Sequence, residues 1–324
     1  TQIEWNNKLS SIPFNYFNTN VSANTFYLQK ESIEETFGNS KGSYSLVISI
    51  LLQDDTLTSS DDLERTLRGI MNNLIDLSTI GINEKNILVC IFLKKITGIY
   101  LIRDQHLSLL KDDKEFLFLS PQKNDFSELN ICIISKSKNT ILYESEALKC
   151  FYWNIMDELR IQNKTMFTCV IKSNVILANS LKKLICSSYH FQKHHGVAVG
   201  SIELDCKGGI VQQIVKYERV HFNLYDMNFY NSTAAVPICS SLSVITLDEQ
   251  LHNLIKIFYC NADDNQSIDY HDYNLALYLH QSNIPINFIS ETCGSIIILT
   301  MLMLIIKIIG LLVIQDIMVI FLIL

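Results

Sequence analysis

The sequence predicts an α/β fold with a mostly parallel central sheet, followed by a C-terminal transmembrane helical segment. Short apolar runs rich in β-branched residues recur along the chain, and stretches with apolar residues at helical spacing separate them. Strands that alternate with helices in this way favour βαβ units and a parallel sheet. No internal repeat or low-complexity tract interrupts the pattern.

The predicted elements begin at residue 44. YSLVISILL (44–52) has the length and composition of a strand, and DDLERTLRGIMNNLIDL (61–77) has the apolar spacing of a helix. NILVCIFL (86–93) is a continuous apolar run, which is typical of a strand buried on both faces. Further strands are predicted at 129–135, 166–171 and 196–204, with helices at 146–162 and around 178–191. We therefore predict one domain at 44–294, after an N-terminal lead-in at 1–43 that lacks clear periodicity.

The C-terminal segment 295–324 is apolar over more than the ~20 residues that cross a bilayer. It contains Lys307, and a lysine can extend its ammonium group toward the membrane surface. A transmembrane segment is therefore predicted at 295–324, and a buried helix of a soluble protein is the alternative.

Composition and charge limit the class of partner. The chain has 324 residues, 48% of them apolar, with a net charge of −7 and a pI near 5.6. Binding to a nucleic-acid backbone calls for clustered Lys and Arg, so nucleic acid is not an expected partner. The nine cysteines form no C-x-x-C pair and several lie inside apolar runs, so we expect reduced, buried thiols on a cytosolic face.

Three strand ends are the candidates for a ligand site. In open α/β sheets the ligand lies beyond the carboxyl ends of the strands. The residues after the strands that end near 52, 92 and 171 are Gln53-Asp54-Asp55, Leu93-Lys94-Lys95 and Lys172-Ser173-Asn174. We expect these groups to meet at one edge of the sheet.

Three nearby histidines, His190, His194 and His195, raise the possibility of a metal site, because His pairs at i and i+4 on a helix can bind zinc. No third ligand and no H-E-x-x-H pattern accompany them, so a solvated helix end is the preferred interpretation. No metal site is predicted.

Seven segments occur in the order ISILLQDD with LERTLRGIMNNL, KNILVCIFLKK, LKCFYWN, GVAVGSIE, VKYERVHFNLYD, HDYNLALYL and IPINFISE. In this order they resemble the catalytic domain of fungal chitin synthases, which are processive inverting glycosyltransferases that use UDP-N-acetylglucosamine. The resemblance covers roughly residues 26–291. It implies a GT-A-like nucleotide-sugar glycosyltransferase domain.

The resemblance also implies roles for particular residues. Asp272 takes the position of the general base that deprotonates the acceptor hydroxyl, although spacing alone favours an N-cap of the helix that follows. Asp54 matches an acid near the opening strand end. Tyr217 and Glu218 match a Phe-Glu-Tyr segment at the substrate site, with a solvated helix face as an equal alternative.

Three positions depart from the family pattern. Active relatives use an Asp near the uridine and a second Asp that helps to hold Mg²⁺ or Mn²⁺ on the diphosphate, and the aligned residues here are Lys94 and Lys172. A lysine cannot ligate a hard cation, so no cofactor is expected here. The Gln-Arg-Arg-Arg-Trp motif is also missing, because the chain continues from Ser290 with Glu291 and contains no arginine there. Two losses of this kind leave little catalysis.

The resulting hypothesis is a chitin synthase-like membrane glycosyltransferase of cell-wall biosynthesis, with weak or no transfer of N-acetylglucosamine to chitin. The alternative is a non-catalytic pseudoenzyme that acts as an interaction partner of an active chitin synthase. The expected partners are UDP-N-acetylglucosamine, bound weakly or not at all, the lipid bilayer, and other chitin synthase copies in a homo- or hetero-oligomer. The expected location is the plasma membrane or its secretory vesicles, with the catalytic-like domain facing the cytosol.

Overall fold

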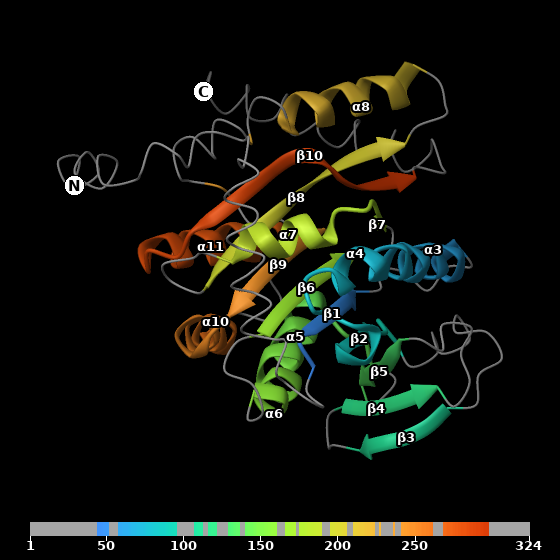
Figure 1. Cartoon of the computed structure of the whole chain (residues 1–324), viewed down its shortest axis with the longest axis vertical. Coiled ribbons are helices and arrows are strands. Elements are labelled where there is room, and N and C mark those ends of the chain that lie inside the picture. The colour runs from blue at the N-terminus through green and yellow to red at the C-terminus, as the bar shows by residue number, and fades with distance from the viewer. Residues whose placement is uncertain are drawn as a thin grey trace, which may run out of the picture.

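The computed structural model describes a folded region between residues 44 and 297 (Figure 1). The described ranges are 44–51, 58–95, 107–112, 116–121, 129–136, 140–160, 166–172, 175–189, 195–205, 210–223, 227, 236, 241–261 and 268–297. The lead-in at 1–43, Asp54 and almost all of the predicted membrane segment lie outside these ranges.

A ten-stranded mixed sheet forms the centre, in the order β3-β4-β5-β2-β1-β6-β9-β8-β10-β7. Seven strands point in one direction, and β4, β7 and β9 point in the other. The α/β class and the largely parallel sheet are therefore confirmed. The strands are β1 (Leu46–Leu51), β2 (Ile87–Phe92), β3 (Leu107–Asp112), β4 (Phe116–Pro121), β5 (Asn130–Lys136), β6 (Met166–Lys172), β7 (Val175–Leu177), β8 (Gly196–Asp205), β9 (Leu242–Leu247) and β10 (Ile286–Ile297).

Helices cover both faces of the sheet (Figure 1). One face carries α3 (Thr58–Asn72), α4 (Leu74–Ser78) and α7 (Leu181–Ser188). The opposite face carries α5 (Glu144–Cys150), the π-helical turn η4 (Phe151–Ile155), α6 (Met156–Arg160), α10 (Glu249–Asn261) and α11 (Ile268–Gln281). A 3₁₀ turn, η2 (Glu84–Asn86), precedes β2, and α8 (Ile210–His221) packs against β8.

The alternation of side chains along β1 explains why its run of apolar residues is continuous. Leu46, Ile48 and Ile50 join the core under α3, α4 and α7, whereas Val47 and Leu51 join the core under α5, α10 and α11. Successive side chains of a strand point to opposite faces, so a strand covered on both sides is apolar at nearly every position.

Buried Asn73, between α3 and α4, bonds to α3, to the residue after β7 and to α7. Its amide Nδ2 donates to the carbonyl oxygens of Gly69 and Ala178 at 2.7 and 2.9 Å, and its Oδ1 accepts from the backbone N–H of Leu181 at 3.0 Å. A buried amide with its donors and acceptor used in this way fixes the relative positions of three elements.

The strand β10 includes the first three residues of the segment that was predicted to cross the membrane. Residues 295–297 pair with 203–205 of β8, so they belong to the sheet, and the apolar segment that remains is 298–324. That segment lies outside the described residues. Among the helices of the described ranges, none is long and apolar enough to cross a membrane.

Candidate functional site

The carboxyl ends of the central parallel strands form the edge at which a ligand is expected. β1 lies between β2 and β6, and Leu51 is level with Phe92 on one side and with Lys172 on the other. The chain winds outward from β1 through β2 to β5, and then returns to place β6 on the other side of β1. Such a reversal of winding direction is where open α/β sheets bind their ligands. The predicted convergence of the strand ends at Phe92 and Lys172 is confirmed.

Lysines and glutamates line this edge. Lys136, the last residue of β5, places its Nζ 2.6 Å from Oε1 of Glu146, and Lys172, the last residue of β6, places its Nζ 3.8 Å from Oε2 of Glu144. All four side chains are largely buried, with 15–16% of their surface exposed. Both lysines therefore lie against carboxylates supplied by the protein itself.

The two glutamates come from the first turn of α5, which begins directly after the edge because it follows β5. The backbone N–H of Tyr143 donates to Oε2 of Glu146 at 2.9 Å, so this carboxylate bonds both the start of the helix and a lysine. Negative side chains near a helix N-terminus are favoured by the helix dipole. The backbone of Lys94 meets the same segment, because its carbonyl accepts the N–H of Leu142 at 2.7 Å.

Among the described groups at this edge, the two carboxylates already lie against lysines, an arrangement that does not favour a divalent cation. Lys94, Lys95, Lys136 and Lys172 carry ammonium groups, which cannot ligate Mg²⁺ or Mn²⁺. Within the described residues, no cluster of three or more His, Cys, Asp or Glu side chains has the geometry to hold a metal ion. Asp54, the acid expected beyond β1, lies outside those residues.

Asp272 is buried in α11, five residues into the helix, and is 8% exposed. The helix begins at Ile268, so the N-cap interpretation of Asp272 is wrong. Its carboxylate lies near Tyr259, whose pKa is raised well above the ordinary value by burial first, and then by the charges of Tyr152 and Asp272. The rings of Tyr152 and Tyr259 stack with centroids 5.6 Å apart. Asp272 thus faces the core under α5 and α10.

The orientation of α11 relates Asp272 to the ligand edge. A short turn at 282–285 joins the end of α11 to the amino end of β10, which runs parallel to β8. The helix therefore runs from the carboxyl ends of these strands toward their amino ends, and Asp272, near its start, lies in the half of α11 that is nearer to the ligand edge. α11 also packs against α5, whose first turn supplies Glu144 and Glu146.

Tyr217 and Glu218 are exposed on α8, and Tyr217 is 70% exposed. The helix is attached to β8 by Arg219, whose Nε donates to the carbonyl of Ile202 at 3.3 Å. The structure therefore agrees with the alternative interpretation, a solvated helix face. Tyr217 has only a loose ring contact with His221, at 6.4 Å between centroids.

Glu291 lies in β10 and forms an ion pair with Lys183 of α7. This contact places Glu291 toward the α3, α4 and α7 face of the sheet, whereas Asp272 belongs to the opposite face. The structure does not bring the two residues together, although the resemblance assigns both to the catalytic region.

His195 has a structural role. Its Nδ1 lies 2.7 Å from Oδ2 of Asp248, and Oδ1 of the same carboxylate accepts the N–H of Leu251 at 2.8 Å, which caps α10. His195 is 5% exposed and directly precedes β8, so the interpretation as a solvated helix end is wrong for this residue. His190 and His194 lie outside the described residues.

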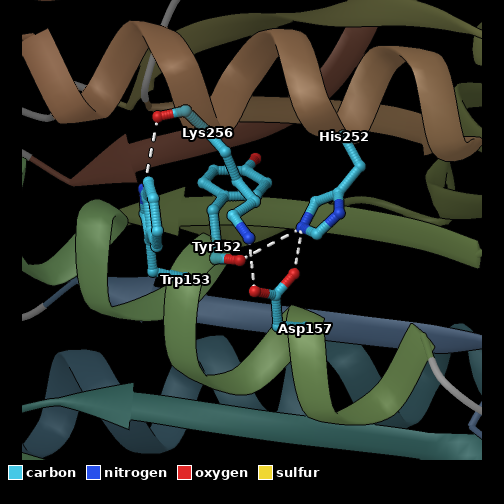
Figure 2. Close-up of polar contacts among 5 residues, drawn as sticks. All are labelled: Tyr152, Trp153, Asp157, His252 and Lys256. Atoms are coloured by element: carbon cyan, nitrogen blue, oxygen red, sulfur yellow. Dashed lines mark hydrogen bonds and ion pairs between the residues drawn. The ribbon is translucent and has the colours of Figure 1, made fainter.

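A polar cluster on α5–α6 and α10 was not predicted from the sequence (Figure 2). Asp157 forms an ion pair with Lys256, and Nε2 of His252 lies 3.7 Å from Oδ1 of Asp157. The indole Nε1–H of Trp153 donates to the carbonyl of Lys256 at 3.2 Å, and the Lys256 ammonium lies 4.3 Å from the centroid of the Trp153 ring. The cluster attaches α10 to the π-helical turn.

The π-helical turn explains why a histidine is buried there. The N–H of Met156 bonds to the carbonyl of Phe151, five residues back, whereas a regular α-helix would bond it to Tyr152. The carbonyl of Tyr152 accepts a hydrogen bond from Nε2 of His252 at 3.1 Å, and His252 is 1% exposed. An aromatic run such as FYWN gives no signal of an extra residue in a helical turn.

Comparison with known proteins adds no family assignment: no family model matches the chain, and no curated protein is significantly similar to it.

Proposed function

We propose that this chain is a chitin synthase-like membrane glycosyltransferase with a GT-A-like domain, and that it has weak or no transferase activity. The support begins with the order of the resembling segments. The expected strand ends follow β1, β2 and β6, which are neighbours in the sheet, and the expected general base, Asp272, lies in the helix before β10. A nucleotide-sugar would lie across the carboxyl edge between β1 and β6.

The ion pair between Lys172 and Glu144 is the observation that carries the loss of activity. At the end of β6, where an active relative would place an oxygen ligand for the metal, Lys172 has its Nζ 3.8 Å from Glu144 Oε2. An ammonium that is already near a carboxylate attracts a diphosphate less than a lone cation does. At this position the departing diphosphate would therefore meet no metal ligand, and the charge of Lys172 is already offset by Glu144; losing one electrostatic element of this kind commonly costs ~10²–10³ in rate.

Donor binding tests this proposal. The full-length chain, purified in a mild detergent, is heated with and without UDP-N-acetylglucosamine in the presence of Mg²⁺ or Mn²⁺, because a ligand that binds only the folded state raises Tm. We expect no rise at sub-millimolar donor, either for the parent chain or for Lys172→Met, which removes the ammonium at nearly constant length. A metal-dependent rise in the parent chain would refute the proposal.

The ion pair of Lys172 with Glu144 also favours a second function, that of a non-catalytic partner of an active chitin synthase. A chain that does not bind UDP-N-acetylglucosamine can contribute only by binding to another protein. The two functions differ in what Asp272 does. If some transfer remains, Asp272→Asn lowers chitin synthesis in membranes that contain this chain as the sole synthase-like protein. If the chain is only a partner, Asp272→Asn leaves the output of a co-expressed active synthase unchanged, whereas removal of the chain lowers it.

A further inference from the structure

The large apolar side chains exposed in the described residues gather on one layer of the molecule. Of nine such residues, six belong to the segment that leads into α5, to the π-helical turn, or to α10 and α11. The layer formed by α3, α4 and α7 exposes one, Ile75. The six are Ile141, Tyr143, Trp153, Ile257, Tyr273 and Leu277.

Four of these residues lie on neighbouring elements, from the π-helical turn to α10 and then to α11. The indole of Trp153 bonds the backbone of α10 at Lys256, next to Ile257. The rings of Phe258 and Tyr278 meet at 5.8 Å between centroids and so join α10 to α11 beside Leu277, while Tyr273 precedes Leu277 by one helical turn. We call Trp153, Ile257, Tyr273 and Leu277 the apolar band; their exposed fractions are 38%, 51%, 58% and 57%.

Charge is scarce among the described exposed positions of α10 and α11. Among the positions of α10 and α11 whose side chains are described, 249–259 and 272–281, seven are exposed, and Glu249 is the one charged residue among them. Lys256, which lies over the Trp153 ring, forms an ion pair with Asp157. A helix face that meets only water normally carries several charges, so this composition indicates a surface that is covered in the working protein.

The chain itself indicates what covers the band. After Ile297, the last residue of β10, come 27 residues that contain two charged side chains, Lys307 and Asp316. If they enter a bilayer, as the proposed function requires, no linker separates the domain from the lipid. Such a short tether holds the whole domain at a high effective concentration at the membrane, so even a weakly lipophilic face of the domain becomes engaged.

We propose that the outer face of α10 and α11, together with Trp153, rests on the lipid bilayer and inserts the apolar band into its interface. The proposal rests on the membrane attachment in the proposed function. Trp and Tyr are the side chains that concentrate at membrane interfaces, and Ile257 and Leu277 supply the buried apolar area. The described exposed positions of α10 and α11 include no basic residue, so binding depends on apolar contact and needs neither anionic lipid nor low salt.

Tryptophan fluorescence tests the proposal directly. The chain has two tryptophans, Trp5 and Trp153, so Trp5→Phe leaves Trp153 as the single tryptophan, which is excited at a wavelength where the 14 tyrosines do not absorb. This variant is reconstituted into phosphatidylcholine vesicles in which part of the lipid is brominated near the headgroup. We expect Trp153 to lose most of its emission to the bromolipid, and we expect no change when the salt concentration is raised.

The matched control places the fluorophore on the opposite layer. Ile75→Trp, combined with Trp5→Phe and Trp153→Phe, puts a tryptophan on α4 at a position that is 79% exposed. We expect no quenching of this tryptophan. A second pair of variants tests the band itself: Leu277→Glu is expected to reduce the quenching of Trp153, whereas Ile214→Glu, on α8, is expected to leave it unchanged.

The outcomes separate this inference from the proposed function. If the chain floats with vesicles in a density gradient but Trp153 is not quenched, the inference fails and membrane attachment stands. If the chain does not float, both fail. A third outcome is quenching that occurs with several chains per vesicle but not with one. In that case a second copy of the chain brings Trp153 to the lipid, and the inference is overturned as well.

Discussion

Replacing His252 tests whether its buried imidazole stabilises the π-helical turn. The side chain is 1% exposed, and its Nε2–H donates to the carbonyl of Tyr152 at 3.1 Å. In His252→Phe a ring of similar shape fills the site but offers no donor, so the carbonyl of Tyr152 loses this bond. A buried polar group without its partner costs about 1–3 kcal/mol, and the ion pair of Asp157 with Lys256 next to it would remain.

The assay is urea unfolding of the full chain in a mild detergent, followed by the fluorescence of Trp153 in the Trp5→Phe background. With a slope of about 3 kcal/mol/M, a loss of about 1–3 kcal/mol lowers the urea midpoint by about 0.3–1 M. His252→Gln is the control, because its amide can donate to the same carbonyl and should recover part of the loss. Equal midpoints for His252→Phe and the parent chain would refute the argument, as would a larger loss for His252→Gln than for His252→Phe.

Three further predictions concern stability and are measured with the same unfolding assay. Asn73→Ala should cost about 2–4 kcal/mol, because it removes three hydrogen bonds in the core, whereas the same change at exposed Asn72 should have little effect. Gly200→Ala should cost about 1–3 kcal/mol, because a Cβ there would meet side-chain atoms from β9 and β10 at 2.9 Å; a midpoint equal to that of the parent would contradict this packing. Burial raises the pKa of the thiols of Cys132, Cys186 and Cys293 from the ordinary 9.0 to about 11, so the folded state holds these protons more tightly than the unfolded state. Their contribution to stability should be intact below pH 9 and should fall between pH 9 and 11, and a midpoint that rises over this range would contradict the assignment.

The strands at the centre of the sheet could be predicted because each is buried on both faces. β1, β2, β5 and β6 are six or seven residues long and largely apolar and buried, and their bounds agree with the predictions to within two residues. The helix predicted at 146–162 is also present, as α5, the π-helical turn and α6. Burial on two sides leaves a clear pattern in the sequence, since almost every position must be apolar.

The elements that were missed depend on contacts between distant residues. β9 is as apolar as β1, but its antiparallel place between β6 and β8 depends on how the whole chain returns to the sheet. The hairpin of β3 and β4 and the helix α10 were not predicted either. For these elements the local pattern is compatible with several pairings, and tertiary packing selects one.

The candidate site was predicted in part. The strand ends that carry Lys94 and Lys172 were placed correctly at one edge, because parallel strands end together. The partner of Lys172 could not be predicted, since Glu144 is 28 residues away and lies on a helix that follows a different strand. Asp272 was expected at the start of a helix, and the helix begins four residues earlier at Ile268, because tertiary contacts extend a helix beyond its most apolar stretch.

The position of β9 has a consequence for how the chain folds. In the hydrogen-bond order of the described sheet, β9 is the one link between the block β3-β4-β5-β2-β1-β6 and the block β8-β10-β7. Residues 242–247 follow β6 and β8 in the chain and precede β10, and β9 has a strand paired along both of its edges, so its pairing needs two partners that are distant in sequence. We therefore expect β9 to pair late in folding. Pulse-labelled hydrogen exchange should show the amides of β9 gaining protection later than those of β1 and β2.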